Sequence, residues 1–363
     1  MPPALTDLQQ FAVGRSLFPP TTLERALDRF GFVQADPIRA PARAQDLTLR
    51  HRVAGYRAGD LERRYALLGI EEDFFVNYGF VTRAVYELMH PRASTAARSF
   101  SQRKRVQAIL GFVHDRGTVH PRDVDDHFAH GRVTNYWGGS SNATTHMLTG
   151  MHYRGMLRVV GRESGIRLYA AQAPMPPPAG KADRARRVDA LVDVLVRTYA
   201  PLPGPSLSNL VLRLRYAVPP WRRELKAALQ RAKRRLSQAR AGGVDWYWPM
   251  DEAIEAHLAP DTVRLLAPFD PVVWDRRRFE LFWGWAYRFE AYTPAKKRLR
   301  GYYALPLLWR DKVIGWGNLS VDEGVLTSDL GYIAGRPPRE TGFRVGLEAE
   351  LDRLRLFLGL EPA

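Results

Sequence analysis

The stretch MLRVVGRESGIRLYA, from Met156 to Ala170, holds two apolar or β-branched runs separated by a short segment with glycine at each end. Glycine adopts the backbone angles of tight turns at low cost, so this pattern predicts a β-hairpin. Three helical patterns precede it: apolar residues at helical spacing over 106–113, a proline-containing helix start at 120–124, and a capped helix over 143–153. Three short helices followed by a hairpin are typical of a winged helix.

The N-terminal part of the chain repeats this plan more faintly. Residues 5–30 have helical spacing, and a strand-like stretch with the sequence FVQADP follows at 32–37. Further on, we expect a short helix over 60–68 and a strand over 73–78. Together these elements predict a first winged helix.

The clearest boundary in the chain is the segment AQAPMPPPAGK at 171–181, whose prolines disfavour a helix and favour an extended linker. Beyond it, apolar residues recur over 188–196 at the spacing of one helix face. Helices are expected next over 207–214 and over the basic stretch 221–240, and a strand is expected over 244–248. We therefore expect a third winged helix after the linker.

The sequence changes in character from Thr262 onward. Five short runs rich in aromatic and β-branched residues recur between turn residues, namely TVRLLAPF, YRFEAYT, GYYALPLLW, KVIGWGNLSV and GVLTSDLGYI. They predict a small antiparallel barrel or sheet, followed by a closing helix over 347–358. The expected fold class is α+β, with tandem winged-helix domains followed by a C-terminal β-barrel or antiparallel sheet. The expected domains are 1–92, 93–173, 174–258 and 259–363.

The chain is strongly basic, with 54 lysines and arginines against 38 acidic residues and a formal net charge of +16. Such an excess indicates a polyanionic partner, and arginine, the dominant basic residue here, binds phosphate with a two-pronged fork. The alternative is a genome rich in G and C, which favours arginine codons whatever the function. The predicted DNA-binding residues are Arg39, Arg43, Arg276, Arg277, Arg278, Lys296, Lys297 and Arg298.

Several kinds of chemistry are excluded by what the sequence lacks. With no cysteine, there is no disulfide, thiolate metal site, iron–sulfur cluster or cysteine nucleophile. The sequence shows neither a signal peptide nor an apolar run of membrane-spanning length, so we expect a cytoplasmic protein with no membrane partner. His120, His127 and His130 lack a convincing further ligand, so no metal and no cofactor are expected.

Gln34 and Asp36 stand out chemically. Alternate residues of an extended strand point to the same side, so the two side chains are expected to project together. A carboxylate beside an amide can hold a water molecule and face a developing positive charge. Aspartate before proline is also common in ordinary turns, and from the residues alone that structural interpretation is favoured.

Nearly the whole chain resembles the winged-helix DNA glycosylases of the AlkZ and YcaQ type. The resemblance rests on Gln34-Ala35-Asp36, on LLAPFDPVVWDRRR at 265–278, and on AYTPAKKRLRGYYALPLLWRDKVIG at 291–315. It implies tandem winged helices and a C-terminal barrel curved around DNA, with Gln34 and Asp36 as the catalytic Gln-x-Asp element of the YcaQ-like branch. Members of this family remove alkylated purines and unhook interstrand crosslinks, which implies double-stranded DNA with such lesions as the partner.

The resemblance also implies a mechanism. An N7-alkylated purine is cationic and leaves easily, so Asp36 would stabilise the sugar cation and orient water, while Gln34 would fix that water. No lysine lies near the motif to form a Schiff base, so we expect a monofunctional enzyme without lyase activity. We also expect a monomer that associates with the nucleoid when it is bound to DNA. Many relatives carry histidine where this chain has Gln45-Asp46, and a Trp-x-His element where it has 77–80. A different lesion preference, or a loss of activity, therefore remains an open alternative.

Two other interpretations of the sequence remain open. A winged-helix transcription regulator could read DNA through residues 135–137 and 140–142, and it would bind one operator tightly as a symmetric dimer. An RNA-binding or architectural protein needs only the charge, and an RNA binder would prefer single strands or A-form helices. A glycosylase differs from both because it releases a base.

Overall fold

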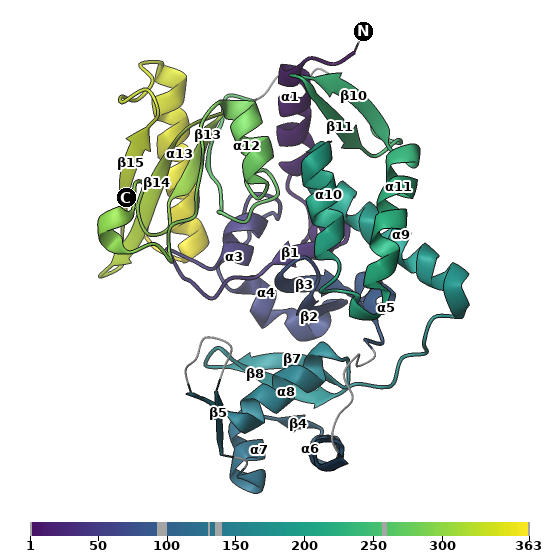
Figure 1. The fold of residues 1–363 in the computed structure, drawn as a ribbon. Coiled ribbons are helices and arrows are strands. Elements are labelled where there is room, and N and C mark those ends of the chain that lie inside the picture. The colour runs from purple at the N-terminus through teal and green to yellow at the C-terminus, as the bar shows by residue number, and fades with distance from the viewer. Residues whose placement is uncertain (1, 93–99, 130, 135–139, 256–259, 362–363) are drawn as a thin grey trace. The chain divides into compact units, whose positions relative to one another are not determined.

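The computed structural model describes residues 2–92, 100–129, 131–134, 140–255 and 260–361 (Figure 1). The chain forms two compact units, each built from segments that are distant in sequence. Unit 1 consists of Met1–Leu61, Val192–Val211 and Leu229–Ala363, and unit 2 consists of Glu62–Leu191 and Leu212–Ala228. The division into four domains stays a prediction.

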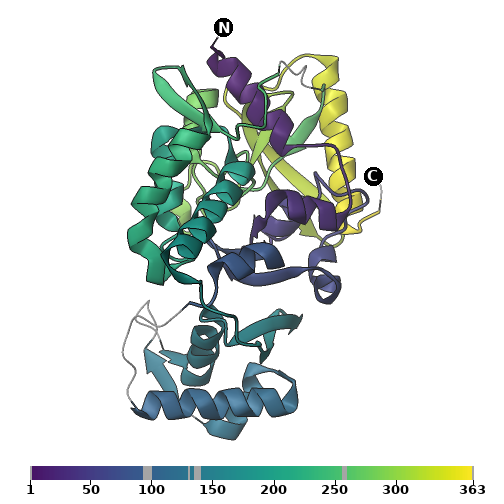
Figure 2. The same cartoon turned by 90° about the vertical axis from the view of Figure 1, so that its right-hand side faces the viewer.

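Unit 1 combines helices from the N-terminus with the strands of the C-terminal third, as Figure 2 shows from a second side. Its helix α2 begins after Thr22, whose side chain accepts the Arg25 N–H, and ends at Gly31 in the left-handed conformation. Four helices have residues in both units: α4 (Asp60–Arg63), α9 (Gly180–Tyr199), α10 (Gly204–Arg213) and α11 (Leu225–Arg235). The other elements of unit 1 are α1 (Leu5–Ser16), α2 (Leu23–Phe30), β1 (Phe32–Gln34), α3 (Ala44–Leu49), β9 (Leu202–Pro203), β10 (Ser237–Ala241), β11 (Val244–Trp248), β12 (Val263–Leu265), α12 (Arg276–Trp283), η3 (Ala295–Lys297), β13 (Leu305–Trp309), β14 (Lys312–Asp322), β15 (Val325–Tyr332) and α13 (Thr341–Leu358).

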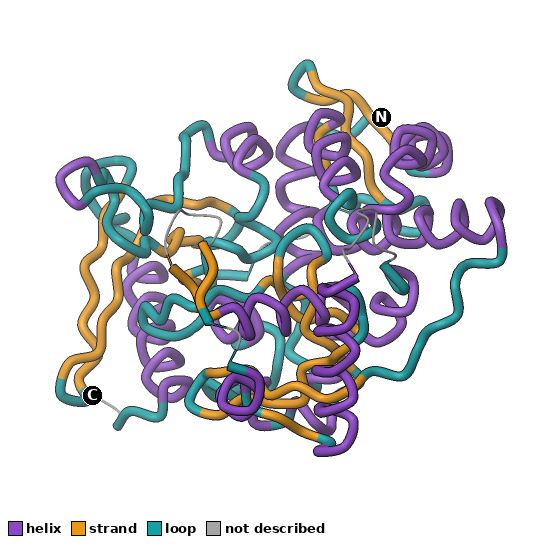
Figure 3. Tube along the Cα trace, turned by 60° about the horizontal axis from the view of Figure 1, so that its bottom comes forward, coloured by secondary structure: helices purple, strands orange, loops and turns teal. Residues whose placement is uncertain are grey.

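The C-terminal strands of unit 1 form a curled, antiparallel half-barrel with the strand order β12-β13-β14-β15. Figure 3 shows its longest pair, β14 and β15, as neighbouring strands at the left-hand edge. Helix α13 lies against β12 so closely that a Cβ added at Gly346 would be 3.0 Å from the Val263 side chain. The C-terminal part is therefore an open antiparallel sheet with a helix packed on it.

A fully buried ion pair joins the N-terminal segment of unit 1 to its C-terminal segment. Both Nη atoms of Arg52 donate to the Asp270 carboxylate, at 2.6 and 2.9 Å, and neither side chain is exposed. Asp270 also accepts the Val272 N–H. The pair therefore fixes the loop 266–275 to the segment that follows α3.

Unit 2 contains three helices packed on a three-stranded sheet of order β4-β8-β7. Its core includes Val113 and Leu148 from the helices and side chains of the hairpin that the sequence predicts, which turns at Ser164 and Gly165 with positive φ. The predicted order of three helices and a hairpin is confirmed. The elements of unit 2 are η1 (Tyr65–Leu67), β2 (Ile70–Phe74), β3 (Tyr78–Thr82), α5 (Arg83–Met89), α6 (Phe100–Arg116), β4 (Thr118–Val119), α7 (Pro121–Phe128), β5 (Arg132–Thr134), β6 (Ser140–Asn142), α8 (Ala143–Tyr153), β7 (Leu157–Glu163), β8 (Ile166–Ala171) and η2 (Pro219–Glu224).

Three sequence expectations are wrong in detail. The strand expected over 73–78 is a hairpin, because the chain turns at 75–77 between β2 and β3. The basic helix expected over 221–240 ends at Arg235, because the residues after it pair with β11 as strand β10. The run YRFEAYT is irregular, because the Glu290 carboxylate accepts backbone N–H groups from residues 299 and 300 and holds a loop.

Helix α9 begins after the proline-rich segment, which is irregular over 172–179 as the sequence predicts. The apolar face predicted over 188–196 is buried. Charged residues occupy much of the rest of this helix. Among the helices that the structure describes, none combines the length and the apolar character that crossing a membrane requires.

Candidate active site

Gln34 is the last residue of β1, and Asp36 follows it after one residue. Both are largely buried, with exposed fractions of 9% for Gln34 and 8% for Asp36. The Asp36 carboxylate accepts the Ile38 N–H at 2.9 Å, which turns the chain directly after the motif. The two candidate catalytic residues therefore share one sheltered segment of unit 1.

The side-chain amide of Gln34 has a defined orientation. Its Oε1 accepts the indole N–H of Trp274 at 2.8 Å, from a residue 240 positions further along the chain. Trp274 packs in turn on Tyr199, with the ring centroids 5.0 Å apart. Because the indole N–H requires an acceptor, the amide oxygen faces Trp274 and the NH₂ group lies on the other side.

Helix α3 contacts the motif through Gln45. The Gln45 side chain is 2% exposed, and its Oε1 accepts the backbone N–H of Asp36 at 3.3 Å. The next residue, Asp46, accepts the Tyr56 hydroxyl at 2.7 Å and the Gly59 N–H at 3.1 Å. Gln45 and Asp46 are thus both buried, and Gln45 contacts the backbone of the motif.

The Asp36 carboxylate lies in a site with few donors. Burial raises the pKa of Asp36 above its ordinary value, and the hydrogen bond from Ile38 opposes this shift only in part. Burial first, and the Asp36 charge second, also raise the pKa of Tyr303 and of Tyr292, so both phenols lie within electrostatic range of the carboxylate. Tyr303 is buried, and its hydroxyl has no hydrogen-bond partner among the residues described, whereas Tyr292 is exposed. An ionised Asp36 therefore carries a poorly compensated charge.

The predicted DNA-binding residues all belong to unit 1 but differ in exposure. Four are exposed: Arg39, Arg277, Lys296 and Lys297. Three are half-buried: Arg43, Arg276 and Arg298. The guanidinium groups of Arg276 and Arg298 lie over tyrosine rings, 4.9 and 5.0 Å from the ring centroids. Seven of the eight predicted residues are therefore partly or fully exposed, and their role in DNA binding stays a prediction.

Arg278 is the exception, because it is completely buried. It lies in the first turn of α12, which Asp275 caps, and one face of that turn packs into the core. Burial lowers the pKa of Arg278 to about 10. The prediction that it contacts DNA is therefore wrong, since its guanidinium donates to the backbone carbonyl oxygens of Tyr199, Pro201, Pro271 and Val272.

Other sequence candidates lie in unit 2 or outside the described residues. In the 77–80 element, Tyr78 donates its hydroxyl to Glu72 at 2.6 Å, and Phe80 is buried. Residues 135–137, considered for DNA reading, lie outside the part of the chain that the structure describes, while Asn142 caps α8. A role of residues 77–80 in lesion preference, and of residues 135–137 and 140–142 in DNA reading, therefore stays a prediction.

The histidines that were considered as metal ligands have structural contacts. A ring nitrogen of His120 accepts the Arg122 N–H and caps α7. His127 stacks on Phe112 with ring centroids 4.5 Å apart, and His130 lies outside the described residues. Within the described ranges, no three histidine or carboxylate side chains gather as a metal site would require.

The arrangement around Gln34 and Asp36 can be compared with known proteins. A family model for the AlkZ-like DNA glycosylases matches residues 27–357, which is nearly the whole chain. The chain belongs to the AlkZ-like DNA glycosylase family. The solved structure of the Streptomyces sahachiroi DNA glycosylase AlkZ matches with a TM-score of 0.65 and 14% sequence identity, over 100% of this chain and 98% of that one. The structural match shows a shared fold, and membership of the family makes the chain a DNA repair glycosylase whose partner is DNA.

Sequence analysis singled out Gln34 and Asp36 as the candidate motif, which stays a prediction, but missed the residues that contact it. Trp274 and Tyr303 lie within the two C-terminal segments that carry the family resemblance, at 265–278 and 291–315. Nothing local in those segments predicts that Trp274 binds Gln34 or that Tyr303 lies near Asp36. The contact of Gln45 was likewise hidden, since a helical glutamine nine residues after Asp36 has many uses.

Proposed function

We propose that the chain hydrolyses the N-glycosidic bond of cationic, N7-alkylated purines in double-stranded DNA, as a monofunctional glycosylase of the Gln-x-Asp type. The observation that carries this proposal is the buried pair of Gln34 and Asp36, in which Trp274 orients the Gln34 amide. Burying a carboxylate that accepts one backbone N–H among the described residues destabilises the fold, and such groups are common at functional sites. Stabilising a positive charge on the sugar of the substrate is a function that suits this carboxylate.

The proposed reaction needs only the residues of the motif and one water molecule. The cationic base leaves with both electrons of the C1′–N9 bond, which neutralises the base and leaves an oxocarbenium-like sugar. Asp36 stabilises that cation and takes a proton from the water whose oxygen bonds to C1′. The Gln34 NH₂ group donates to the water oxygen and positions it. The raised pKa makes the Asp36 carboxylate a stronger base than an exposed aspartate.

The proposed enzyme has no lyase activity. Strand cleavage by a glycosylase lyase requires an amine that attacks C1′ and forms a Schiff base. The chain has no lysine before Lys104, so none lies in the motif or in α3. The expected product is an intact abasic site, which hot alkali cleaves and the enzyme alone does not.

Base release under single-turnover conditions tests the proposal. Wild-type protein should release N7-methylguanine from a duplex, and Asp36→Asn should be slower by about 10² or more, because one preorganised electrostatic group is removed. DNA affinity should not change. The matched control is Asp28→Asn, which removes the same charge from an exposed residue of α2 and should keep the wild-type rate. Unchanged release by Asp36→Asn would contradict the mechanism, and DNA binding without release of any cationic purine would favour a regulator.

Interstrand crosslinks formed through purine N7 atoms are proposed as a second substrate class. Each attached purine is cationic, so the same departure of a neutral base applies to both ends of the crosslink. Unhooking should appear on a denaturing gel as conversion of crosslinked duplex to single strands. Asp36→Asn should slow unhooking and methylpurine release by similar factors.

We also propose that the fold contains tandem winged helices. The protein acts as a cytoplasmic monomer on nucleoid DNA. The order α6, α7, α8 and the β7–β8 hairpin supports a winged helix in unit 2. Light scattering during size-exclusion chromatography tests the monomer. A dimer with one preferred operator sequence would contradict it.

A further inference from the structure

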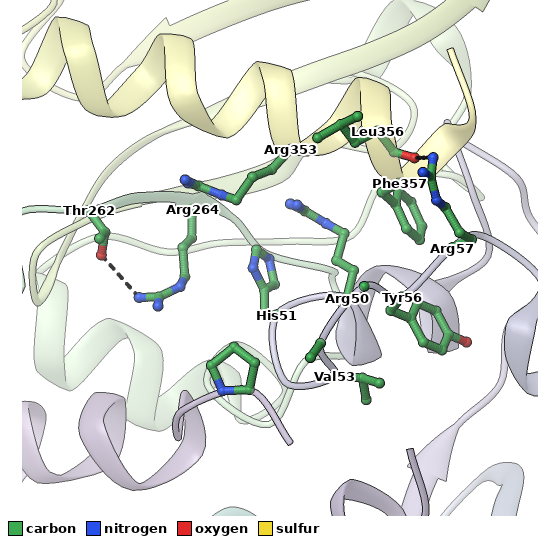
Figure 4. A pocket seen from close by; sticks show the side chains of 13 residues that line it. Arg50, His51, Val53, Tyr56, Arg57, Thr262, Arg264, Arg353, Leu356 and Phe357 are labelled. Atoms are coloured by element: carbon green, nitrogen blue, oxygen red, sulfur yellow. Dashed lines mark hydrogen bonds between the residues drawn. The ribbon is translucent and has the colours of Figure 1, made fainter. Parts of the chain in front are cut away.

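A concave site of about 440 Å³ lies in unit 1 at the C-terminal end of α3 (Figure 4). Pro20 and three longer segments line it: the segment that follows α3, strand β12 with the residue before it, and the last turns of α13. Its lining includes four arginines and a histidine, namely Arg50, Arg57, Arg264, Arg353 and His51. Figure 4 shows Arg50, His51, Arg264 and Arg353 in the same site, with the Arg264 guanidinium directed at Thr262.

Among the residues that the structure describes, one carboxylate forms ion pairs with members of this group of four arginines. Glu350, itself unexposed, accepts from Arg50 at 2.5 Å and from Arg353 at 3.0 Å. Within the described ranges, the guanidinium groups of Arg264 and Arg57 have no carboxylate within ion-pair distance: the Arg264 group donates to Thr262 Oγ1 and that of Arg57 to a backbone carbonyl. The site therefore carries a net positive charge.

Arg50 has a buried donor without an acceptor among the described residues. Its side chain is only 3% exposed, and its guanidinium donates through Nη2 alone, to Leu265 O and to Glu350. Its buried Nε–H has no acceptor among the residues that the structure describes. Buried donors without acceptors are expensive, so the chain keeps here a cationic donor that none of the described residues satisfies.

The histidine of the site is neutral. Burial, followed by the charges of Arg50 and Arg264, holds the pKa of His51 well below its ordinary value. Its Nε2 faces the Leu265 carbonyl oxygen at 3.0 Å and so carries the ring proton. Nδ1 is then an acceptor, which suits a ligand that offers a hydroxyl or a protonated oxygen beside its negative charge.

Apart from Thr262, most of the remaining lining is apolar. Val53, Tyr56, Leu356 and Phe357 contribute side chains, and the rings of Tyr56 and Phe357 stack with centroids 6.3 Å apart. The volume is many times the share of about 30 Å³ that a water molecule has in the liquid. A ligand with an anionic group and an attached sugar-like body therefore fits better than a small ion such as chloride.

We propose that this site binds a phosphate group through Arg50, Arg264 and Arg353. Arginine forks match the oxygen geometry of phosphate, and a phosphate would supply an anionic partner for Arg264, whose guanidinium donates to Thr262 Oγ1. The phosphate belongs either to the DNA backbone or to a free phosphorylated small molecule, and both sources present the same chemistry. The proposal is independent of base excision, because its tests measure binding and not base release.

The free-phosphate arm uses thermal unfolding of the full chain. About 10 mM inorganic phosphate or pyrophosphate, against chloride at equal ionic strength, should raise the melting temperature of wild type, since a ligand of the folded state stabilises it. Arg264→Gln should lose most of that increase. The matched control is Arg344→Gln, an exposed arginine of the same helix as Arg353 and about 14 Å along the axis from it, which should keep the increase.

The DNA arm measures duplex affinity against salt concentration. If a backbone phosphate occupies the site, Arg264→Gln should bind undamaged duplex about tenfold more weakly at low salt, and its slope of log affinity against log salt should fall by about one unit. A free ligand would give the phosphate effect with unchanged DNA binding. Either result supports the site, and the two together assign its source.

The proposal is overturned if Arg264→Gln matches Arg344→Gln both in phosphate stabilisation and in the salt slope. Without phosphate, Arg264→Gln should fold at least as stably as wild type, because it removes a partly buried charge from a repelling group. Arg57→Gln, at an exposed position of the same site, repeats both measurements if Arg264→Gln does not fold.

Discussion

Asp36 and Asp270 are both largely buried carboxylates of unit 1, but their surroundings treat the charge in opposite ways. Asp270 receives two N–H donors from Arg52 and one from the backbone. Asp36 receives one backbone N–H, and its pKa is raised. A similar difference separates Arg52, which has a carboxylate partner, from Arg264, which has none among the described residues. Buried charges that are compensated hold the fold together, whereas those left uncompensated indicate sites for a ligand or a reaction.

The largest expected effect comes from breaking the compensated pair. Asp270→Asn leaves Arg52 buried without its counter-charge, which should lower the free energy of unfolding by about 3–5 kcal/mol. Denaturant unfolding followed by circular dichroism measures this loss. The control Asp352→Asn removes an exposed carboxylate of α13 and should leave stability nearly unchanged. A stable Asp270→Asn protein would remove the distinction between the two aspartates.

The pH dependence of base release tests Asp36, the uncompensated carboxylate of the comparison. In the proposed mechanism Asp36 acts in its ionised form. Because its pKa is raised, the single-turnover rate should rise with pH through a midpoint above 3.8 and then level off. Below that midpoint the rate should fall about tenfold for each pH unit. Asp36→Asn should lack this limb.

The same raised pKa has a consequence for stability. The folded state binds the Asp36 proton more tightly than the unfolded state does, so this group lowers stability as pH rises from 3.8 through the folded-state pKa. Asp36→Asn should therefore be no less stable than wild type at neutral pH. A large loss of stability would place Asp36 with Asp270 as a structural residue.

Trp274→Phe tests whether orientation of the Gln34 amide matters. The substitution keeps an aromatic ring and removes the N–H that Gln34 Oε1 accepts, so base release should slow by about tenfold with DNA affinity unchanged. Trp309→Phe is the control, because its indole N–H binds Asp261 elsewhere in unit 1. Equal rates for the two variants would show that the hydrogen bond from Trp274 does not position Gln34.

The smallest expected effect concerns the exposed cations. Lys296→Ala combined with Lys297→Ala should weaken duplex binding about equally for all sequences and should reduce the salt slope by up to about two units, because each phosphate contact releases counterions. Lys312→Ala, an exposed lysine of β14, serves as the control and should leave the slope unchanged. Unchanged binding by the double variant would remove 296–297 from the DNA interface.

Local patterns in the sequence predict local structure well in this chain. The hairpin over 156–170 and the helix over 143–153 are confirmed, because glycine turns and capping residues act on their immediate neighbours. The motif itself was found through resemblance, since its bare residues also fit an ordinary turn. The run YRFEAYT shows the limit, because its strand-like composition is overridden by backbone hydrogen bonds to Glu290.

The sequence could not predict which side chains of the site are buried or which distant residues they contact. Arg276, Arg277 and Arg278 look equivalent as letters, yet one is exposed, one is half-buried and one is enclosed, because a helix turns each to a different face. Trp274 and Gln34 meet across 240 residues, and no local signal encodes such a contact. The arginine site was missed for the same reason, since its members come from three distant segments.

The division of unit 1 between the two ends of the chain has a consequence for synthesis. The ribosome makes Arg52 more than two hundred residues before Asp270, and Arg50 three hundred before Glu350. Until those later residues emerge, the N-terminal segment lacks the partners that make its burial tolerable, and long-range contacts of this kind form slowly. We therefore expect a chain that ends before α13 to lack base-release activity, because its N-terminal segment has not yet met these partners.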